Sequence, residues 1–309
     1  MTAFRLRPPA SPFFGGRGAS EPKGYDAVLF AAPHATPYPG IDNRVHEGSG
    51  RAIRKAVDED PEWANHWNFD LGGPLLGNQG FAFGDLGDLE TQSSEGEANR
   101  AQIEALTRAI LEAGAVPLMI GGDDSAPIPF ISAFARYAPL TILQIDAHID
   151  WREERRGERL GYSSTMRRAS EMAHVEKIIH VGTRGLGSAR RGEVEDALAW
   201  GAKFVPARDL HAHGIAAALD HVPAGGNVLI TLDCDGLDPS AIPGVMAPTP
   251  GGLSYTQVIE IVAGVCERSR LVGFDLIEFV PERDLTGVGA ITAASIIFNV
   301  VGGLAKRKA

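Results

Sequence analysis

The feature that most constrains the fold of this chain is an acidic cluster directly after a short apolar run. Residues 140–145, Leu-Thr-Ile-Leu-Gln-Ile, have the composition of a buried β-strand, and Asp146, His148 and Asp150 follow. Side chains at positions i, i+2 and i+4 of an extended chain point to the same side, so we expect these three groups to converge. The order predicts a polar site at the end of a buried strand.

A second cluster, Asp233 and Asp235, follows a similar apolar run at residues 227–232. Four carboxylates and an imidazole gathered at strand ends would repel one another unless cations neutralise them. One such cluster alone could be a structural group of caps and ion pairs. Two clusters of the same kind make that alternative weaker, because unpaired buried charge is costly. The pair predicts a site for two metal ions.

Strand-like and helix-like segments alternate along the chain, which predicts a mostly parallel sheet covered by helices on both faces, a three-layer α/β/α sandwich. No composition break marks an interdomain linker, so we expect a single domain over residues 23–309. Residues 1–22, rich in Gly and Pro, are predicted to form an arm over the surface or onto a neighbouring subunit. The predicted strands are residues 25–30, 81–83, 116–120, 140–145, 177–181, 203–206, 227–232 and 272–277. The predicted helices are residues 49–58, 95–113, 193–200, 215–220, 254–268 and 292–305, with capping boxes at Ser94–Glu97 and Ser254–Gln257.

Open α/β sheets bind ligands beyond the carboxyl ends of their strands. Two further predicted strands end in acids: Asp123 and Asp124 follow residues 116–120, and Glu278 follows residues 272–277. We therefore expect these groups to join the two clusters in one site.

The net charge and the cysteine content restrict the classes of partner and the compartment that are expected. The net charge of −10 argues against nucleic acid and mildly favours a cationic substrate. The chain has two cysteines, Cys234 and Cys266, so no disulfide framework is expected and a reducing cytoplasm fits. Cys234 lies between two predicted ligands and is expected to point into the core. The sequence contains no apolar stretch typical of a membrane span and no signal-peptide pattern near Met1, so no membrane partner is expected.

The motifs resemble those of the ureohydrolase family, which comprises arginases, agmatinases and related guanidino-compound hydrolases. The matching segments are collinear over roughly residues 25–305: GSGRAIR at 48–54, DLGD at 85–88, GGDDS at 121–125, DAHID at 146–150, DCDGLDP at 233–239, PGGL at 250–253, and Glu278. The resemblance implies an arginase-like α/β fold and a two-ion centre, most simply Mn²⁺, with Ni²⁺ or Co²⁺ as alternatives. It also implies hydrolysis of a guanidinium to urea and an amine, by a trimer or hexamer.

The resemblance also implies roles for individual residues. Six would bind the two metal ions: Asp124, Asp146, His148, Asp150, Asp233 and Asp235. Asp146 and Asp233 would bridge the ions, His148 and Asp235 would complete one, and Asp150 and Asp124 the other. Two catalytic roles follow: Asp150 would pass a proton to the leaving nitrogen, and Glu278 would hold the guanidinium.

Two positions depart from the family pattern. Family members usually have His where this chain has Asp124, and a carboxylate there favours hard Mn²⁺ over softer ions. The family commonly has a Ser-His-Gly-Thr stretch, and Ser164 stands about where its His would fall. Ser164 is therefore a predicted substrate contact. His34 and His46 could reach the site, although each is more simply explained as a surface histidine.

Three functions remain open at this point. The first is hydrolysis of agmatine or a related small cationic guanidino compound. The second is amidohydrolysis of another C–N substrate, such as a formimino compound or a small guanidine. The third is a non-catalytic subunit that pairs with an active ureohydrolase. A homo-oligomer is expected in the first two cases and a hetero-oligomer in the third.

Overall fold

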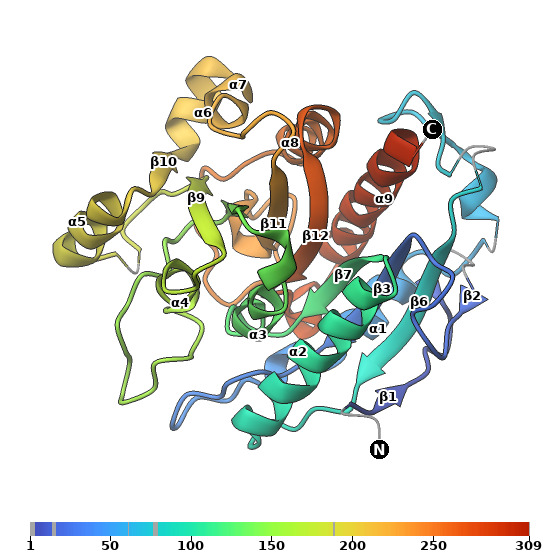
Figure 1. Cartoon of the computed structure of the whole chain (residues 1–309), viewed down its shortest axis with the longest axis horizontal. Helices are drawn as coiled ribbons and strands as arrows, with labels where there is room; N and C mark the ends of the chain where they lie inside the picture. The colour runs from blue at the N-terminus through green and yellow to red at the C-terminus, as the bar shows by residue number, and fades with distance from the viewer. Residues whose placement is uncertain (1–3, 14–16, 61, 77–79, 188, 309) are drawn as a thin grey trace.

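A mixed but mostly parallel β-sheet forms the middle layer of the protein (Figure 1). This computed structural model describes residues 4–13, 17–60, 62–76, 80–187 and 189–308. Within them the sheet has ten strands in the order β1-β6-β3-β7-β12-β11-β8-β9-β10, with β2 also paired to β6. The strands are β1 (Leu6–Arg7), β2 (Arg17–Gly18), β3 (Ala27–Ala32), β6 (Phe83–Leu89), β7 (Val116–Gly121), β8 (Leu140–Ile145), β9 (Val175–Val181), β10 (Lys203–Val205), β11 (Asn227–Asp233) and β12 (Arg270–Ile277). A separate pair is formed by β4 (Trp67–Asn68) and β5 (Gly73–Pro74).

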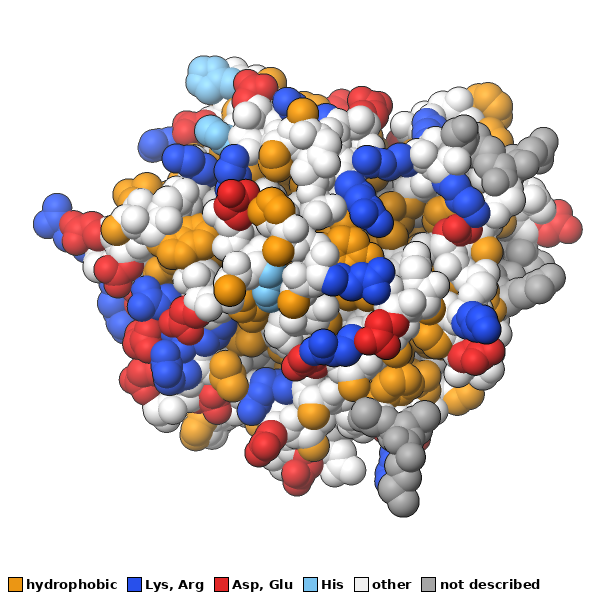
Figure 2. All heavy atoms as spheres, in the orientation of Figure 1, with side chains coloured by type: hydrophobic (Ala, Val, Ile, Leu, Met, Phe, Trp, Pro, Cys, Tyr) orange, Lys and Arg blue, Asp and Glu red, His pale blue; other side chains and the backbone are white. Residues whose placement is uncertain are grey.

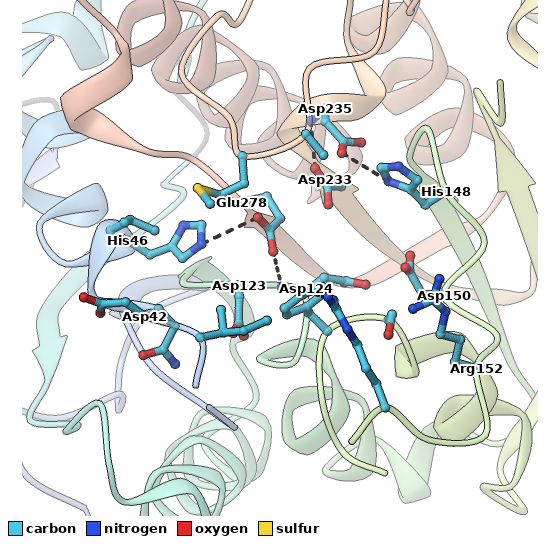
Figure 3. Close-up of a pocket in the computed structure, with 18 residues that line it drawn as sticks. Asp42, His46, Asp123, Asp124, His148, Asp150, Arg152, Asp233, Asp235 and Glu278 are labelled. Atoms are coloured by element: carbon cyan, nitrogen blue, oxygen red, sulfur yellow. Dashed lines mark hydrogen bonds and ion pairs between the residues drawn. The ribbon is translucent and has the colours of Figure 1, made fainter. Parts of the chain in front are cut away.

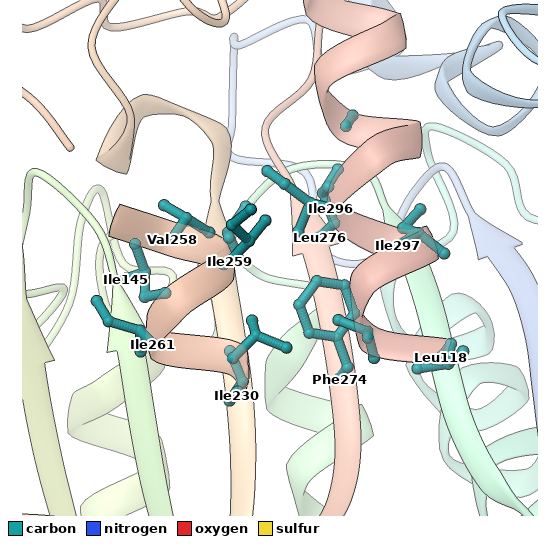
Figure 4. Packing of buried hydrophobic residues seen from close by; sticks show 14 of the residues in the cluster. Leu118, Ile145, Ile230, Val258, Ile259, Ile261, Phe274, Leu276, Ile296 and Ile297 are labelled. Atoms are coloured by element: carbon teal, nitrogen blue, oxygen red, sulfur yellow. The ribbon is translucent and has the colours of Figure 1, made fainter. Parts of the chain in front are cut away.

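Helices cover both faces of this sheet, which confirms the predicted three-layer class. The helices are α1 (Ser49–Lys55), α2 (Gly96–Glu112), α3 (Pro127–Ser132), α4 (Thr165–Ser170), α5 (Arg191–Trp200), α6 (Ala207–His213), α7 (Ala216–Leu219), α8 (Tyr255–Arg268) and α9 (Val288–Lys308). One hydrophobic cluster joins the sheet to α1, α6, α7, α8 and α9, and a second joins it to α2, α3, α4 and α5. Figure 4 shows the first cluster, where Val258 and Ile261 of α8 and Ile297 of α9 pack against the strands.

Strand alternation explains this division. The inner strands are buried on both faces, so their residues are apolar nearly throughout. In β12, Phe274 and Leu276 pack with α8 and α9, whereas Val272 belongs to the opposite cluster. The buried runs that are visible in the sequence therefore coincide with the centre of the sheet.

Two local predictions are wrong. The run 83–89 continues as strand β6 through residues that were expected to follow a shorter strand at 81–83. The predicted capping box at Ser94 is absent, because α2 begins at Gly96 with Glu95 as its N-cap and no side-chain cap hydrogen bond. The box at Ser254 is confirmed: its hydroxyl accepts from the Gln257 backbone N–H at 3.2 Å, and the Gln257 side chain accepts in return at 3.0 Å.

The described part of residues 1–22 lies against the chain's own sheet. Strand β1 pairs antiparallel with β6, and β2 pairs parallel with it. Phe13, between them, is fully buried, with its ring centroid 5.1 Å from that of Phe298. These contacts lie at the edge of the sheet, far from the strands that carry the acidic clusters.

The expectation that no apolar stretch is typical of a membrane span is wrong by length and composition alone, because helix α9 meets both criteria with a mean hydropathy of 1.9. In the folded chain 72% of this window is buried. Ile296, Ile297, Val300 and Val301 are fully buried in the core, as is usual for the central helix of a packed layer. The contacts of α9 are those of a core helix.

Arg54 of α1 forms a buried ion-pair cluster with two carboxylates of β6. Its guanidinium donates to Asp85 at 2.7 and 2.9 Å and to Asp88 at 2.5 Å, and its side chain is 4% exposed. Removing one partner of a buried pair leaves the other charge uncompensated, which costs about 3–5 kcal/mol. Segments 48–54 and 85–88, which both carry the family resemblance, are therefore joined by ion pairs that link helix α1 to the sheet.

We expect Arg54→Leu to lower the free energy of unfolding by about 3–5 kcal/mol, because Asp85 would keep its charge with no cation beside it. Chemical denaturation monitored by circular dichroism measures the change. Arg51→Leu, on the exposed side of the same helix, is the matched control and should change stability by under about 1 kcal/mol. Equal losses in the two variants would contradict a special role for the buried ion pairs.

Asp275 of β12 is a fully buried carboxyl in the core of the sheet. One oxygen accepts from the Thr231 hydroxyl at 2.7 Å, and the other has no hydrogen-bond partner in the described chain. Burial raises the pKa of Asp275 from 3.8 to about 8. The side chain is thus an uncharged acid in the folded protein at neutral pH.

The Asp275→Asn variant should therefore gain stability relative to the parent as pH rises. The unfolded carboxyl ionises near pH 4 and the folded one near pH 8, so the parent's free energy of unfolding falls between these values, by up to about 1.4 kcal/mol per pH unit. The amide does not ionise and lacks this loss. Denaturation of both proteins at pH 5 and pH 8 measures the effect. A difference in stability that is the same at both pH values would show that Asp275 does not titrate in this range.

Candidate metal centre

Four adjacent strands at the middle of the sheet deliver acidic residues to one site. In space they follow the order β7, β12, β11 and β8, although β12 is the last in the sequence. Asp123 and Asp124 follow β7, Glu278 follows β12, Asp233 ends β11, and the Asp146 cluster follows β8. Figure 3 shows Asp124, Glu278, Asp233, His148 and Asp150 facing one cavity from different segments. Asp146 is not part of the cavity lining and is 1% exposed. The predicted meeting of the acidic strand ends is what the structure shows.

The predicted ligands form two groups of three that share one residue. Asp146, His148 and Asp235 make the first group, and Asp124, Asp146 and Asp150 make the second. In each group one potential ligand atom per residue lies within 4.8 Å of the others. Asp146 therefore lies at the centre of the site.

Asp233 belongs to neither group, although it lines the same cavity. One of its oxygens accepts from the Asp235 backbone N–H at 2.7 Å. Its side chain is nonetheless close enough to Asp235 and Asp146 for their charges to raise its pKa, in addition to the larger effect of burial. Asp233 is therefore adjacent to the centre but is less convergent than the other predicted ligands.

The groups converge through turns rather than through extended chain, so the expectation of strand alternation is wrong in its geometry. Strand β8 ends at Ile145, and the His148 backbone N–H donates to Asp146 at 2.6 Å in a tight turn. Asp235 likewise belongs to a short 3₁₀ helix, Cys234–Gly236. Cys234 is fully buried, as predicted, and it is a free thiol like Cys266.

The side chain of Gln144 forms hydrogen bonds with two of the predicted ligands. Its side-chain amide donates to Asp146 at 2.6 Å and to Asp150 at 2.9 Å, and its oxygen contacts His180 Nδ1 at 2.5 Å. Burial lowers the pKa of His180 to about 4, so this imidazole is neutral and can donate through Nδ1. Sequence reasoning missed Gln144, because a single polar residue inside an apolar strand has no distinguishing spacing.

We expect Gln144→Leu to weaken metal affinity by about 10–100-fold, since groups that orient metal ligands commonly contribute this much. Calorimetric titration of the metal-free protein with Mn²⁺ measures it. Gln102→Leu, on α2, serves as the control and should leave the affinity unchanged. Unaltered affinity in the Gln144 variant would show that the two carboxylates hold their positions without the amide.

The buried carboxyl groups of the cluster favour binding of positive charge. Burial, with neighbouring acids second, raises the pKa values of Asp124, Asp150, Asp233 and Glu278 well above their usual range. Burial would lower the pKa of His148, but its hydrogen bonds to Asp146 and Asp235 raise that pKa to about 12. Protons therefore accumulate where no other cation neutralises the acids.

The donor set fits divalent metal ions. Both oxygens of Asp124 are buried without a hydrogen-bond partner among the described residues, so they are available as ligands. His148 Nδ1 lies 3.2 Å from Asp235 and 3.4 Å from Asp146, so an ion between them would replace a proton. Carboxylate oxygens with one imidazole nitrogen suit hard to borderline ions.

Backbone strain marks both residues with predicted catalytic roles. Asp150 has a φ of 43° and Glu278 a φ of 63°; Arg156 is the third non-glycine residue with positive φ in the described chain. Such conformations cost on the order of 1–3 kcal/mol and tend to occur at functional sites. The turn at Glu278 directs its carboxylate to the backbone N–H of Asp124, which donates at 2.9 Å.

The prediction that His34 and His46 are surface histidines is wrong, because both are 2% exposed. His46 lines the cavity, with Nε2 3.5 Å from Glu278 and Nδ1 3.2 Å from the Phe279 carbonyl (Figure 3). His34 does not line the cavity and instead contacts Thr91 and Glu47. The packing of 44–46 against residues after β12 carries His46 inward, and nothing in the local sequence signals it.

The cavity has a volume of 380 Å³. Besides the acids, its lining includes Arg152, Arg155, Tyr162 and Ser163, all from the segment after Asp150. Ser164 is fully buried and is not part of the lining, so the structure places its neighbour Ser163 at the cavity instead. The predicted substrate contact of Ser164 therefore has no geometric support.

Comparison with known proteins agrees with the fold. A model of the family described as the arginase family matches residues 26–302. The chain is 29% identical to the mitochondrial guanidino acid hydrolase of Homo sapiens over 293 residues, covering 93% of this chain and 80% of that protein. It is 29% identical to the mitochondrial agmatinase of Gallus gallus over 223 residues, covering 70% and 65%. The solved structure of proclavaminate amidino hydrolase from Streptomyces clavuligerus has a TM-score of 0.82 at 24% identity, covering 99% of this chain and all of that one, which shows the shared fold.

Proposed function

Because the chain belongs to the arginase family, we propose that it is a metal-dependent hydrolase that cleaves a guanidino compound to urea and an amine. The observation that carries the proposal is the pair of ligand groups that meet at Asp146. The relatives named as guanidino acid hydrolase and agmatinase support the same reaction class. An agmatinase-like substrate is one of the alternatives that an assay must separate.

We assign the metal ions to six residues: Asp124, Asp146, His148, Asp150, Asp233 and Asp235. Two divalent ions bound there would supply a nucleophile from water at neutral pH and would stabilise negative charge that develops on the substrate. Mn²⁺ is the preferred candidate, since five of the six groups are carboxylates, and Ni²⁺ or Co²⁺ are the alternatives. The unpartnered oxygens of Asp124 support its inclusion.

The chain's own residues orient the substrate and move the proton that the attacking water loses. Glu278 is the proposed guanidinium partner, because a carboxylate can accept paired, charge-assisted hydrogen bonds from a planar cation. Asp150 is the proposed proton carrier to the leaving nitrogen, which must be protonated before it departs. His46, beside Glu278, keeps that carboxylate in position. All three groups are at most 9% exposed, which limits competing hydrogen bonds from bulk water.

Urea release from the metal-loaded protein tests the proposal. The purified chain is stripped of metal, reloaded separately with Mn²⁺, Ni²⁺, Co²⁺ or Zn²⁺, and incubated with agmatine, arginine, 4-guanidinobutyrate, guanidine and formiminoglutamate. We expect metal-dependent urea release from at least one guanidino compound, with Mn²⁺ giving the highest activity. Release of formamide from formiminoglutamate alone would establish the formimino alternative, and no release from any substrate would support a non-catalytic subunit.

The assembly and location are further proposals. We propose a homo-oligomer, a trimer or hexamer, and a cytoplasmic enzyme. The two buried free cysteines are compatible with a reducing compartment. Size-exclusion chromatography with light scattering measures the assembly, and a monomer at micromolar concentration would contradict it.

A further inference from the structure

The cavity carries positive as well as negative side chains. Arg152 and Arg155 line it together with the acids of the cluster. Arg152 Nε lies 3.6 Å from Glu193, which offsets part of its charge. Among the described residues, Arg155 forms no ion pair with a carboxylate. A net charge of −10 for the whole chain therefore does not describe the charges that a substrate meets.

Arg155 differs in this respect from its neighbours in the sequence. Arg159, Arg167 and Arg168 all pair with Glu153 at 2.7–3.2 Å. On the molecular face in Figure 2, acidic and basic side chains are likewise interspersed on the side that carries α4 and α5. Arg155 is half-buried at the cavity instead of joining that surface network.

Aromatic side chains fix the position of Arg155. Its guanidinium carbon lies 5.3 Å from the ring centroid of Tyr38 and 5.4 Å from that of Tyr162, and Nη1 donates to the Tyr162 hydroxyl. The two tyrosine rings are 4.6 Å apart in an edge-on arrangement, and the Tyr38 hydroxyl contacts the Ser163 hydroxyl at 2.8 Å. Because the guanidinium is held mainly by aromatic rings, most of its N–H donors remain free to bind a ligand.

Arg155 and Tyr162 line the same cavity as Glu278, the proposed guanidinium partner. Burial is the main cause of the raised pKa of Tyr162, which the charge of Arg155 lowers and that of Glu278 raises. A small molecule that contacts Glu278 can therefore extend towards the Tyr162–Arg155 pair inside one cavity of 380 Å³. A second cation at that end would meet a fixed positive charge, whereas an anion would meet a planar donor set.

We propose that Arg155 binds a carboxylate at the far end of the substrate, so that the enzyme's substrate class is the ω-guanidino acids. This inference rests on the proposed function, and it deepens it by naming the second recognition group. The guanidinium end is held by Glu278 and the carboxylate end by Arg155, with Tyr162 orienting the arginine. The site then selects zwitterionic guanidino compounds over dicationic ones such as agmatine.

Three probes with similar chain lengths test the proposal: 4-guanidinobutyrate, butylguanidine and agmatine carry a carboxylate, a methyl group and an ammonium at the far end. We expect the wild-type protein to give the highest kcat/KM with 4-guanidinobutyrate. In Arg155→Gln the ratio of kcat/KM for 4-guanidinobutyrate to that for butylguanidine should fall by about 10–100-fold, mainly through a higher KM, as for a lost charge-assisted hydrogen bond. Arg159→Gln, whose side chain is 57% exposed and outside the cavity, should leave the ratio unchanged.

Two outcomes would overturn the role of Arg155 while leaving the proposed function intact: a wild-type preference for agmatine, or an unchanged ratio in Arg155→Gln.

If Arg155→Gln does not fold, Arg155→Lys is tested in its place, because lysine keeps the charge but loses the planar donor pair. The ratio of kcat/KM values should then fall by a smaller factor. An unchanged ratio counts against carboxylate binding by Arg155.

If none of these probes and no other guanidino compound of the wider panel releases urea, the proposed function fails, and calorimetric binding of the probes to the metal-loaded protein still tests the role of Arg155. Tighter binding of 4-guanidinobutyrate than of butylguanidine, lost in Arg155→Gln, would support it. Equal binding of the two compounds would reject it.

Discussion

Asp146→Ala is expected to abolish tight metal binding and urea release together. Asp146 is the one residue common to both ligand groups, so its removal takes a ligand from each ion. It also removes the acceptor for the His148 backbone N–H and one of the two carboxylate acceptors of the Gln144 amide, so the turn after β8 and the Gln144 side chain each lose a contact. Activity should fall by more than about a thousandfold, comparable with the loss of an essential catalytic group.

Metal content per chain, measured by elemental analysis after gel filtration, is the primary readout. Asp196→Ala removes a carboxylate that is 68% exposed, and as the control it should keep both ions and full activity. Circular dichroism checks that the Asp146 variant is folded. Two tightly bound ions per folded chain in Asp146→Ala would reject the assignment of the centre.

Glu278→Gln should separate the two properties: metal binding is retained and turnover is lost. Glu278 belongs to neither ligand group, but its carboxylate lines the cavity between Asp124 and His46. The neutral amide keeps the size of the side chain and cannot hold a guanidinium by charge, so kcat/KM should fall by about a hundredfold or more.

Elemental analysis and steady-state kinetics on the same preparation separate the two effects. Glu282→Gln, at an exposed position close by, is the matched control and should behave as wild type. Normal kcat/KM in Glu278→Gln would remove this residue from the substrate site. Loss of metal in that variant would place it among the ligands instead.

Much of the fold could be predicted from the sequence because the inner strands are buried on both faces. Runs such as residues 140–145 and 227–232 are continuous and apolar, and their ends carry the acids that meet at the centre. Strand β6, between β1 and β3, was harder to predict. In β6, Asp85 is buried inside a strand because Arg54 neutralises it, and such a compensation is invisible without the fold.

The candidate site was predictable where several acids follow strands, and not where a residue depends on a distant partner. His46 is buried by contact with Phe279, which is 233 positions away in the chain. Arg155 lies in a segment with no periodic pattern, so only the packing against Tyr38 and Tyr162 distinguishes it from the arginines around it. Gln144 is recognisable only once the two carboxylates beside it are placed.

The place of β12 in the sheet has a consequence for synthesis of the protein on the ribosome. This strand is made last but lies between β7 and β11, so until it emerges the nascent chain holds two separate sets of strands. Each set presents an unpaired, apolar edge, which is prone to pair with other chains. Productive folding must therefore wait until translation is nearly complete, and a chain that stops before Arg270 would offer those edges to chaperones rather than close around a metal ion.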